Sequence, residues 1–429
     1  MSVNKNLLDF INRSPTPFHA VKNMRTELVK HGFKELRESE SEKLEPSGQY
    51  FVVRNNSSLV AFRVSDKGSM VGVRMVGAHT DSPCLKLKPN AVVEHDGYVQ
   101  LGVEPYGGVL MNPWFDRDLS LAGRVTLMST DKILFSRLID FETPIAFIPS
   151  LAIHLDREAN SGRKVNPQTM LPPVVGLSGT DKFNLKQLIL DKLVDSQLAK
   201  KTDVVSDFEL SLYDTNPAAI IGLDEAFIAG SRLDNLVSCW IGLKALIDSS
   251  SVDTQLLICN DHEEVGSGSF AGARSDLLES VLVRLVGDAA KFSSVMSRSL
   301  LVSADNAHGL HPNFLEKHDQ SHGPVLNAGP VLKFNANQSY ATNSETAAIL
   351  NLAARNKNIP MQSFVSRSDI GCGSTIGPLT STRLGVKALD VGIPTFGMHS
   401  IRELAGARDL DALYSLLCGL FELPSIEVA

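Results

Sequence analysis

Acidic residues and histidines recur at the ends of short apolar runs, and this pattern constrains the fold more than any other feature of the chain. Runs rich in valine and leucine, typical of buried strands, lead into His79, Asp261, Asp305 and His399. Helix-like stretches such as residues 234–248 lie between the runs. Strands that alternate with helices predict an α/β sheet covered on both faces. Because ligands bind at the carboxyl ends of strands in such sheets, we expect these side chains to meet there.

The pattern changes between about residues 91 and 222, where short strands are separated by glycine and proline, as at 97–103 and 124–128. We interpret residues 91–222 as an inserted, mostly β domain. Residues 1–90 and 223–429 then form one αβα sandwich.

The composition excludes several classes of function. The 429 residues are 43% hydrophobic and carry a formal net charge of −7, which argues against nucleic acid as a partner. No apolar run reaches the ~18 residues of a membrane span, and the N-terminus lacks the apolar core of a secretory signal. We therefore expect no membrane partner. The five cysteines form an odd set with no Cys-x-x-Cys pair, which argues against a disulfide framework, so we expect a reducing, cytoplasmic location.

The motif Gly-Ala-His79-Thr-Asp81 places a carboxylate two residues after a histidine. Asp81 can accept a hydrogen bond from one ring nitrogen of His79 and leave the other nitrogen to bind a metal ion. Taken alone, the motif fits a histidine satisfied within a turn better than it fits a metal ligand.

Two neighbouring glutamates, Glu263 and Glu264, follow another predicted strand. Because adjacent side chains diverge, one glutamate can bind metal while the other stays unligated as a general base. Taken alone, an acidic pair is better explained by a solvated surface, so this hypothesis depends on other ligands converging on the same place.

Asp234 begins the predicted helix 234–248. An N-cap and a carboxylate that bridges two cations about 3.5–4 Å apart fit this position equally well. Asp305, with His308 three residues later, and His399 supply further candidate ligands.

Five motifs together resemble the M18 family of metallopeptidases, the aspartyl aminopeptidases, and most of all its bacterial members. The motifs are Gly-Ala-His79-Thr-Asp81-Ser-Pro, Arg-Leu-Asp234-Asn-Leu, Asp-His-Glu263-Glu264-Val-Gly-Ser, Ser-Ala-Asp305-Asn-Ala-His308 and Met-His399-Ser-Ile-Arg-Glu. The resemblance covers almost the whole chain, and it implies an αβα zinc-peptidase domain interrupted by a β-rich dimerisation or lid domain.

The resemblance implies two zinc ions in each subunit. One would be held by His79 and Asp305, the other by Glu264 and His399, with Asp234 bridging them. Each ion then has one imidazole, one terminal carboxylate and a shared carboxylate, which leaves room for water. Imidazole and carboxylate ligands also suit manganese or cobalt.

The resemblance also assigns catalytic and substrate-binding residues. Glu263 would be the general base, and Asp81 would orient His79. The residues implied to bind substrate are His154, His308, Lys333 and Tyr340. His154 would stabilise the oxyanion of the reaction intermediate or, alternatively, serve as a third histidine ligand.

The expected function is therefore a metallo-aminopeptidase that acts on peptides and prefers N-terminal Asp or Glu, since Lys333 could pair with a substrate carboxylate. By resemblance, its dimers would assemble into a homododecamer. The alternatives are a related two-metal aminopeptidase of neutral or broad specificity and a non-catalytic binding or scaffold protein with the same fold.

Overall fold

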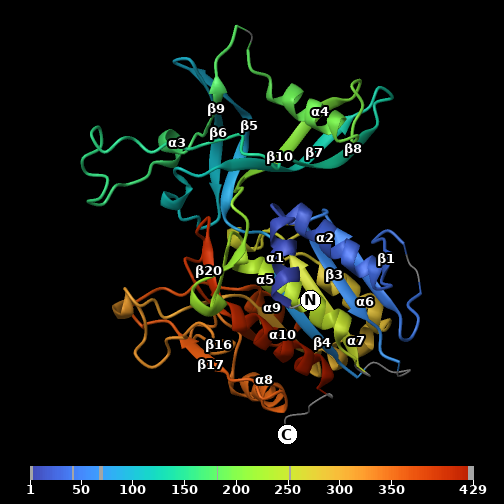
Figure 1. The fold of residues 1–429 in the computed structure, drawn as a ribbon. Helices are drawn as coiled ribbons and strands as arrows, with labels where there is room; N and C mark the ends of the chain where they lie inside the picture. Colours follow the sequence, from blue (N-terminus) through green and yellow to red (C-terminus); the bar gives the residue numbers. More distant parts are fainter. Residues whose placement is uncertain (1–2, 41–42, 67–70, 181, 251–252, 424–429) are drawn as a thin grey trace. The chain divides into compact units, whose positions relative to one another are not determined.

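The computed structural model describes residues 3–40, 43–66, 71–180, 182–250 and 253–423, and the chain divides into two compact units (Figure 1). The first unit comprises Met1–Asp81, Ala218–Met398 and Glu403–Ala429, and the second comprises Ser82–Pro217 and His399–Arg402. These divisions differ from the boundaries expected at residues 90 and 222. The first one falls earlier because strand β5, Cys84–His95, runs continuously through residue 90.

The first unit is built on a nine-stranded sheet in the order β1-β2-β3-β13-β4-β14-β18-β16-β17. Its strands are β1 (Lys34–Leu36), β2 (Gln49–Arg54), β3 (Ser58–Arg63), β13 (Thr254–Asn260), β4 (Val73–His79), β14 (Leu300–Ala304), β18 (Lys387–Gly392), β16 (Val331–Phe334) and β17 (Gln362–Val365). At the centre, β4 pairs parallel with both β13 and β14, and β14 pairs parallel with β18. The carboxyl ends of these central strands therefore meet at one edge of the sheet.

Helices cover the two faces of this sheet. One group consists of α1 (Val3–Asn12), α2 (Pro17–Lys30), α5 (Leu233–Asp248), α8 (Ser344–Asn356) and α10 (Ala407–Glu422), and the other of α6 (Leu277–Val286), α7 (Ala289–Ser297) and α9 (Ile376–Leu384). Successive strand residues point to opposite faces, so Val76 and Leu257 pack in the first group's core while Met75 and Leu256 pack in the second group's core. The predicted αβα sandwich is confirmed.

A smaller, five-stranded sheet completes the first unit. Its order is β11 (Ala219–Ile221), β12 (Phe227–Gly230), β20 (Glu403–Gly406), β19 (Pro394–Phe396) and β15 (Ala307–His308). The apolar run at 391–396 reads in sequence as one strand but belongs to two sheets, because β18 ends at Gly392 and β19 begins at Pro394. Proline lacks a backbone N–H, which favours the end of one ladder there.

The second unit is a six-stranded antiparallel sheet with two short helices. The strand order is β8 (Leu134–Asp140), β7 (Leu119–Met128), β10 (Val204–Asp214), β5, β6 (Tyr98–Tyr106) and β9 (Val174–Leu177), and the helices are α3 (Pro167–Met170) and α4 (Leu185–Asp195). Leu121, Val125 and Leu127 alternate along β7 and pack into a core of their own with Ile189 of α4. The β-rich character predicted for this part of the chain is confirmed.

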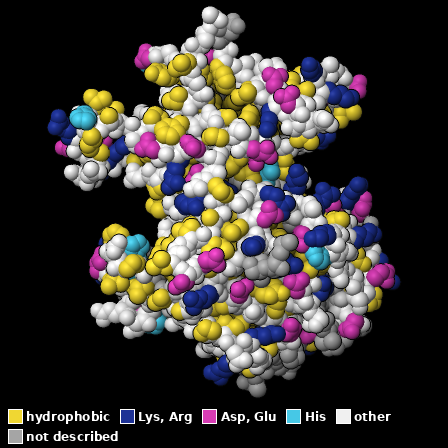
Figure 2. Space-filling view, in the orientation of Figure 1, with side chains coloured by type: hydrophobic (Ala, Val, Ile, Leu, Met, Phe, Trp, Pro, Cys, Tyr) yellow, Lys and Arg dark blue, Asp and Glu magenta, His cyan; other side chains and the backbone are white. Residues whose placement is uncertain are grey.

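The surface carries charges of both signs. On the face shown in Figure 2, Lys and Arg side chains are interspersed with Asp and Glu, and neither sign gathers into a continuous stripe. Among the helices in the described part of the chain, none combines the length and the apolarity that crossing a bilayer requires.

Candidate active site

Three neighbouring strands of the first unit deliver acidic and histidine side chains to one edge of the sheet. β4 ends at His79, β13 leads into the short 3₁₀ helix η3 (Glu263–Val265), and β14 leads directly into Asp305. Because the three strands run parallel, the edge where they end is the ligand-binding edge of an open α/β sheet. The convergence predicted from the sequence is therefore present for these residues.

His79 lies at the centre of this cluster, and its side chain is almost fully buried. Its Nε2 atom is 3.3 Å from Asp234 Oδ1 and 3.5 Å from Asp305 Oδ1. His79, Asp234 and Asp305 offer ligand atoms that all lie within 4.8 Å of one another, and so do His79, Glu263 and Glu264. One imidazole is thus shared by two groups of carboxylates.

Asp234 enters this cluster from the beginning of α5. Its φ and ψ angles, −82° and 106°, are not helical, and the N-cap of the helix is Arg232. The backbone N–H of Asp234 donates to Oε2 of buried Glu403 at 2.9 Å. Asp234 is therefore not the N-cap of α5, and its side chain lies against His79.

Asp81 connects His79 with both glutamates. Its two carboxylate oxygens accept hydrogen bonds from the backbone N–H groups of Glu263 and Glu264, each at 3.1 Å. The Nδ1 atom of His79 lies 3.0 Å from the Asp81 carbonyl oxygen and 3.5 Å from Asp81 Oδ1. An Nδ1–H donor toward these oxygens leaves the lone pair on Nε2, which faces the other carboxylates.

Burial and mutual repulsion shift the pKa values of these side chains strongly. Burial is the largest cause that raises the pKa of Glu263 to about 8 and that of Glu264 to about 10, and nearby carboxylates add to it. Burial also disfavours charge on His79, but hydrogen bonds to Asp234, Asp305 and Asp81 outweigh burial and raise its pKa. The cluster holds more carboxylates than this imidazole can balance.

These residues fit a divalent cation. The donor set is one imidazole with carboxylates, which is the ligand chemistry of catalytic zinc sites. A cation beside Asp234 and Glu264 would offset the burial and the carboxylate repulsion that raise the glutamate pKa values.

Lys333 lies on the far side of Asp305, with its side chain 1% exposed. Its ammonium donates to Asp305 Oδ2 at 3.1 Å and to the carbonyl oxygen of Asn306 at 3.2 Å. Burial opposes ionisation of Asp305, but Lys333 and His79 outweigh burial and lower the pKa of this carboxyl. Lys333 therefore holds Asp305 as an oriented carboxylate.

Two other predicted substrate residues gather near Lys333. Its ammonium lies 4.9 Å from the ring centroid of buried Tyr340. The rings of Tyr340 and His308 both pack edge-on against Phe364, with centroids 6.5 and 5.6 Å away. The structure thus brings Lys333, Tyr340 and His308 together around one aromatic residue.

Comparisons with known proteins agree with this site. The profile of the family described as aminopeptidase I zinc metalloprotease (M18) matches residues 10–421. The chain belongs to the M18 family. It is 53% identical over 418 residues to probable M18 family aminopeptidase 2 of Pseudomonas fluorescens strain SBW25, and the match covers 97% of each chain.

Solved structures of M18 relatives have the same fold. A chain in the cryo-EM structure of the Ape4 and Nbr1 complex superposes with a TM-score of 0.93 at 39% identity, covering 98% of this chain and 85% of that one. The S. cerevisiae mApe1 dodecamer gives 0.85 at 28% identity, covering 98% of this chain and 96% of that one. The chain is an aminopeptidase of the M18 metallopeptidase family.

Two predicted site residues of this M18 chain lie in the second unit. His399 has a left-handed backbone, with φ of 69°, and its Nδ1 is 3.2 Å from the carbonyl oxygen of Gly108. His154 lies on an exposed loop within 151–155. The roles predicted for His399 and His154 rest on the sequence motifs.

Several residues that support the cluster have no role predicted from the sequence. Glu403 stands in the quoted motif Met-His399-Ser-Ile-Arg-Glu, so its position in that motif was the available signal. The side chain of Asn235 donates to the carbonyl oxygen of Ala304 at 2.8 Å, and the thiol of Cys239 to that of His79 at 3.0 Å. These last two contacts fix the ends of β14 and β4, and no pattern in the sequence predicts them.

We predict that Glu264→Gln stabilises the metal-free protein. The native pKa of Glu264, about 10, exceeds its ordinary value of 4.5. Between these pH values the unfolded chain releases a proton that the folded chain retains, so this group lowers stability increasingly as pH rises. Thermal melts in chelator should therefore show an advantage of the variant that grows from about pH 5 to about pH 9.

Zinc should reverse this order. An ion that binds only the folded state stabilises it by mass action, and the variant would lack one carboxylate predicted to hold that ion. Glu345→Gln, at a half-exposed side chain paired with Lys387, serves as the control and should not change with pH in this way. An advantage of Glu264→Gln that shrinks as pH rises would contradict the prediction.

Proposed function

We propose that this protein is a two-zinc aminopeptidase that hydrolyses the first peptide bond of peptides. The observation that carries the proposal is the buried cluster in which His79, Asp234 and Asp305 lie within 4.8 Å of one another while Glu263 and Glu264 face the same imidazole. Carboxylates on two sides of one histidine supply enough ligands for two neighbouring cations.

In this proposal His79 and Asp305 would hold one ion, Glu264 and His399 would hold the other, and Asp234 would contribute to both, as the sequence motifs imply. The contact of His399 Nδ1 with the Gly108 carbonyl oxygen supports the assignment, because it favours the tautomer with the lone pair on Nε2. Imidazole and carboxylate ligands would accept manganese or cobalt as well as zinc.

Glu263 acts as the general base. Bound zinc lowers the pKa of water and polarises the substrate carbonyl. Glu263 accepts a proton from the attacking water and later donates it to the departing amine. Its position supports this role, because Asp81 fixes its backbone N–H while burial and nearby carboxylates raise its pKa to about 8.

We expect Glu263→Gln to lower kcat by about 10²–10⁴-fold, the usual contribution of a general base. Bound zinc, measured by mass spectrometry of the native protein, should not change, because Glu263 is not a ligand in this proposal. The control Glu345→Gln should keep full activity. An unchanged kcat would remove Glu263 as the base, and loss of zinc would make it a ligand.

The proposed substrates are peptides with N-terminal Asp or Glu. A buried positive charge at Lys333, beside Tyr340 and His308, would favour a substrate carboxylate by Coulomb attraction in a region of low dielectric constant. One observation favours the alternative of neutral or broad specificity: the same ammonium already donates to Asp305 and to Asn306.

Peptides that differ only in an N-terminal Asp, Glu, Leu or Lys separate these two specificities. We expect higher kcat/KM for the acidic peptides, and we expect Lys333→Met to lower their rates more than the Leu rate. Because Lys333 also orients Asp305, some loss should appear for all four peptides. Lys387→Met, at a surface lysine paired with Glu345, is the matched control. Similar kcat/KM of the parent on all four peptides would support broad specificity, and an equal loss in Lys333→Met would show that Lys333 does not select the acidic residue.

We also propose that the protein is a homo-oligomer whose second unit makes dimer contacts. The relative mApe1 forms a dodecamer, and the second unit exposes apolar side chains, including Tyr98, Leu134 and Leu177 at 51%, 64% and 75%. Hydrophobic side chains lie on the surface over β5, β6 and β9 (Figure 2). Exposed apolar surface of this kind is typical of protein interfaces.

A cytoplasmic location is proposed as well, and the five free cysteines support it.

Light scattering coupled to size-exclusion chromatography tests the assembly. We expect a mass of several subunits, up to the twelve implied by the relative, at micromolar protein concentration. Dilution should reveal any dissociation into dimers. A monomer at every concentration would contradict the proposal.

A further inference from the structure

The loop that carries Glu263 and Glu264 is long, and regular structure covers little of it. It runs from residue 261 to 276, between β13 and α6, with η3 as its only helical turn. His262, Gly266 and Ser267 are left-handed, with φ of 61°, 89° and 60°. The position of such a segment must come from contacts with its surroundings.

Ser58, the buried first residue of β3, joins two distant points of this loop. Its hydroxyl accepts a hydrogen bond from the backbone N–H of Asp261 at 2.9 Å and donates one to the carbonyl oxygen of Ala271 at 2.7 Å. Asp261 lies two residues before Glu263. One hydroxyl on a sheet strand thus fixes the beginning of the loop and its later half together.

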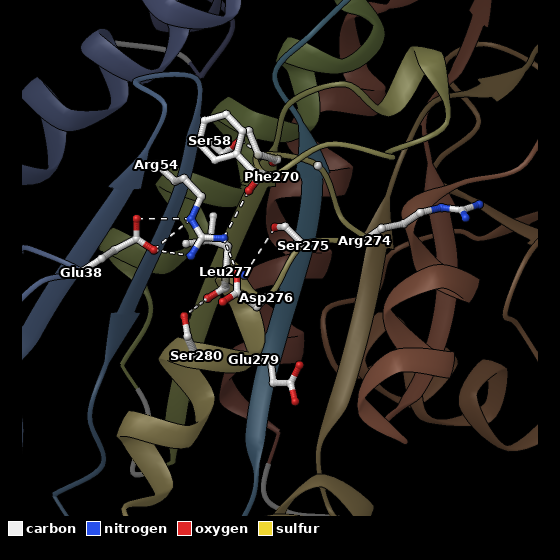
Figure 3. A network of polar contacts seen from close by, with 12 residues as sticks. Glu38, Arg54, Ser58, Phe270, Arg274, Ser275, Asp276, Leu277, Glu279 and Ser280 are labelled. Atoms are coloured by element: carbon white, nitrogen blue, oxygen red, sulfur yellow. Dashed lines mark hydrogen bonds and ion pairs between the residues drawn. The ribbon is translucent and has the colours of Figure 1, made fainter.

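Arg54, the last residue of β2, holds the far part of the same loop (Figure 3). Its Nη1 atom donates to Asp276 Oδ1 at 2.5 Å and to the carbonyl oxygen of Phe270 at 3.2 Å. The Nε atom donates to Glu38 Oε1 at 2.9 Å, on the side away from the loop. The planar guanidinium therefore connects the loop to the end of β2 through hydrogen bonds whose directions its geometry fixes.

The loop leaves two of its apolar side chains exposed. Phe270 and Val265 of the loop are 64% and 53% exposed. A pocket of about 490 Å³ lies beside Arg54 and is lined also by Glu38, Asp276 and Ser280. The Arg54 side chain itself is 12% exposed, and its guanidinium is held by these polar bonds. A second arginine, Arg383 of α9, donates to the carbonyl oxygen of Arg274 at 2.8 Å and holds the loop from another side.

We propose that Arg54 and Ser58 are positioning residues for Glu263, and that the β2–β3 hairpin keeps the catalytic loop in register with the ligands at the strand ends. Asp81 fixes the inner side of the loop through the N–H groups of Glu263 and Glu264. The hairpin fixes the outer side. This inference rests on the proposed role of Glu263 as general base.

The test uses the zinc-loaded protein with Arg54→Met, which keeps the aliphatic stem, and with Ser58→Ala. Misplacing a catalytic group by about 1 Å can reduce the rate by about 10²-fold. We expect kcat to fall by about 10–100-fold in each variant, with little change in KM. In the Glu263→Gln background, followed at high enzyme concentration, Arg54→Met should cause no further loss, because the group that it positions is already gone.

The network offers graded controls. Asp276→Asn removes the charge of a partner on the loop whose side chain is 66% exposed, so it should weaken the ion pair and lower kcat without endangering the fold. Glu38→Gln removes the charge of a partner away from the loop and should have a smaller effect. Arg25→Ala breaks a comparable surface pair, with Glu35, that does not touch the loop, and it should leave kcat unchanged.

Amide hydrogen exchange gives a readout independent of activity. Peptides within 262–276 should exchange faster in Arg54→Met and Asp276→Asn than in the parent, while peptides of α10 and β4 should not. Unchanged kcat and unchanged loop exchange in both variants would overturn the inference. So would a loss that multiplies with Glu263→Gln, since that indicates a general defect. An unchanged kcat for Glu263→Gln alone would instead refute the base assignment, and the exchange data would still show whether Arg54 holds the loop.

Discussion

The cost of burying several carboxylates at one edge of a sheet governs the structure around it. Five acidic side chains meet one imidazole and one ammonium there: Asp81, Asp234, Glu263, Glu264 and Asp305 with His79 and Lys333. Burial disfavours each charge. Two classes of carboxyl result, which differ in the direction of the pKa shift. Asp305, beside Lys333, has a lowered pKa, while Glu263 and Glu264 have raised values.

This division assigns different tasks to similar groups. In the proposed function, Asp305 with its lowered pKa stays ionised and oriented as a metal ligand, whereas Glu263, whose pKa is about 8, can exchange a proton. Glu264, whose pKa is about 10 without metal, would need a bound cation to stay ionised as a ligand. Backbone donors make the arrangement compatible with a rigid fold. The two carboxylate oxygens of Asp81 accept hydrogen bonds from the backbone N–H groups of Glu263 and Glu264, and Glu403 accepts one from the backbone N–H of Asp234. The polar cluster therefore determines backbone positions as well as side-chain positions.

Much of the fold and part of the site could be predicted from the sequence, for physical reasons that differ. The apolar runs before His79 and Asp305 identify strands, and parallel strands bring their ends together without any further information. Asp234 could not be placed in this way, because an N-cap and an inward-facing ligand occupy the same point in sequence. The contact of its N–H with Glu403 spans 169 positions, which no local pattern encodes. Likewise, the run at 391–396 is mostly apolar, yet it belongs to two sheets.

The position of Lys333 has a consequence for how specificity and catalysis relate in this chain. Its ammonium is within hydrogen-bond distance of Asp305 and close to the ring of Tyr340, so one charge serves both the proposed metal ligands and the proposed substrate pocket. A substrate carboxylate that drew this ammonium toward itself would weaken its bond to Asp305. An acidic peptide would then alter the ligand field of the site that cleaves it. A rigid ammonium would avoid this coupling but could offer a substrate only long-range attraction, which is weaker and less selective than a hydrogen bond. If both proposed roles hold, one buried charge would link substrate selection to turnover.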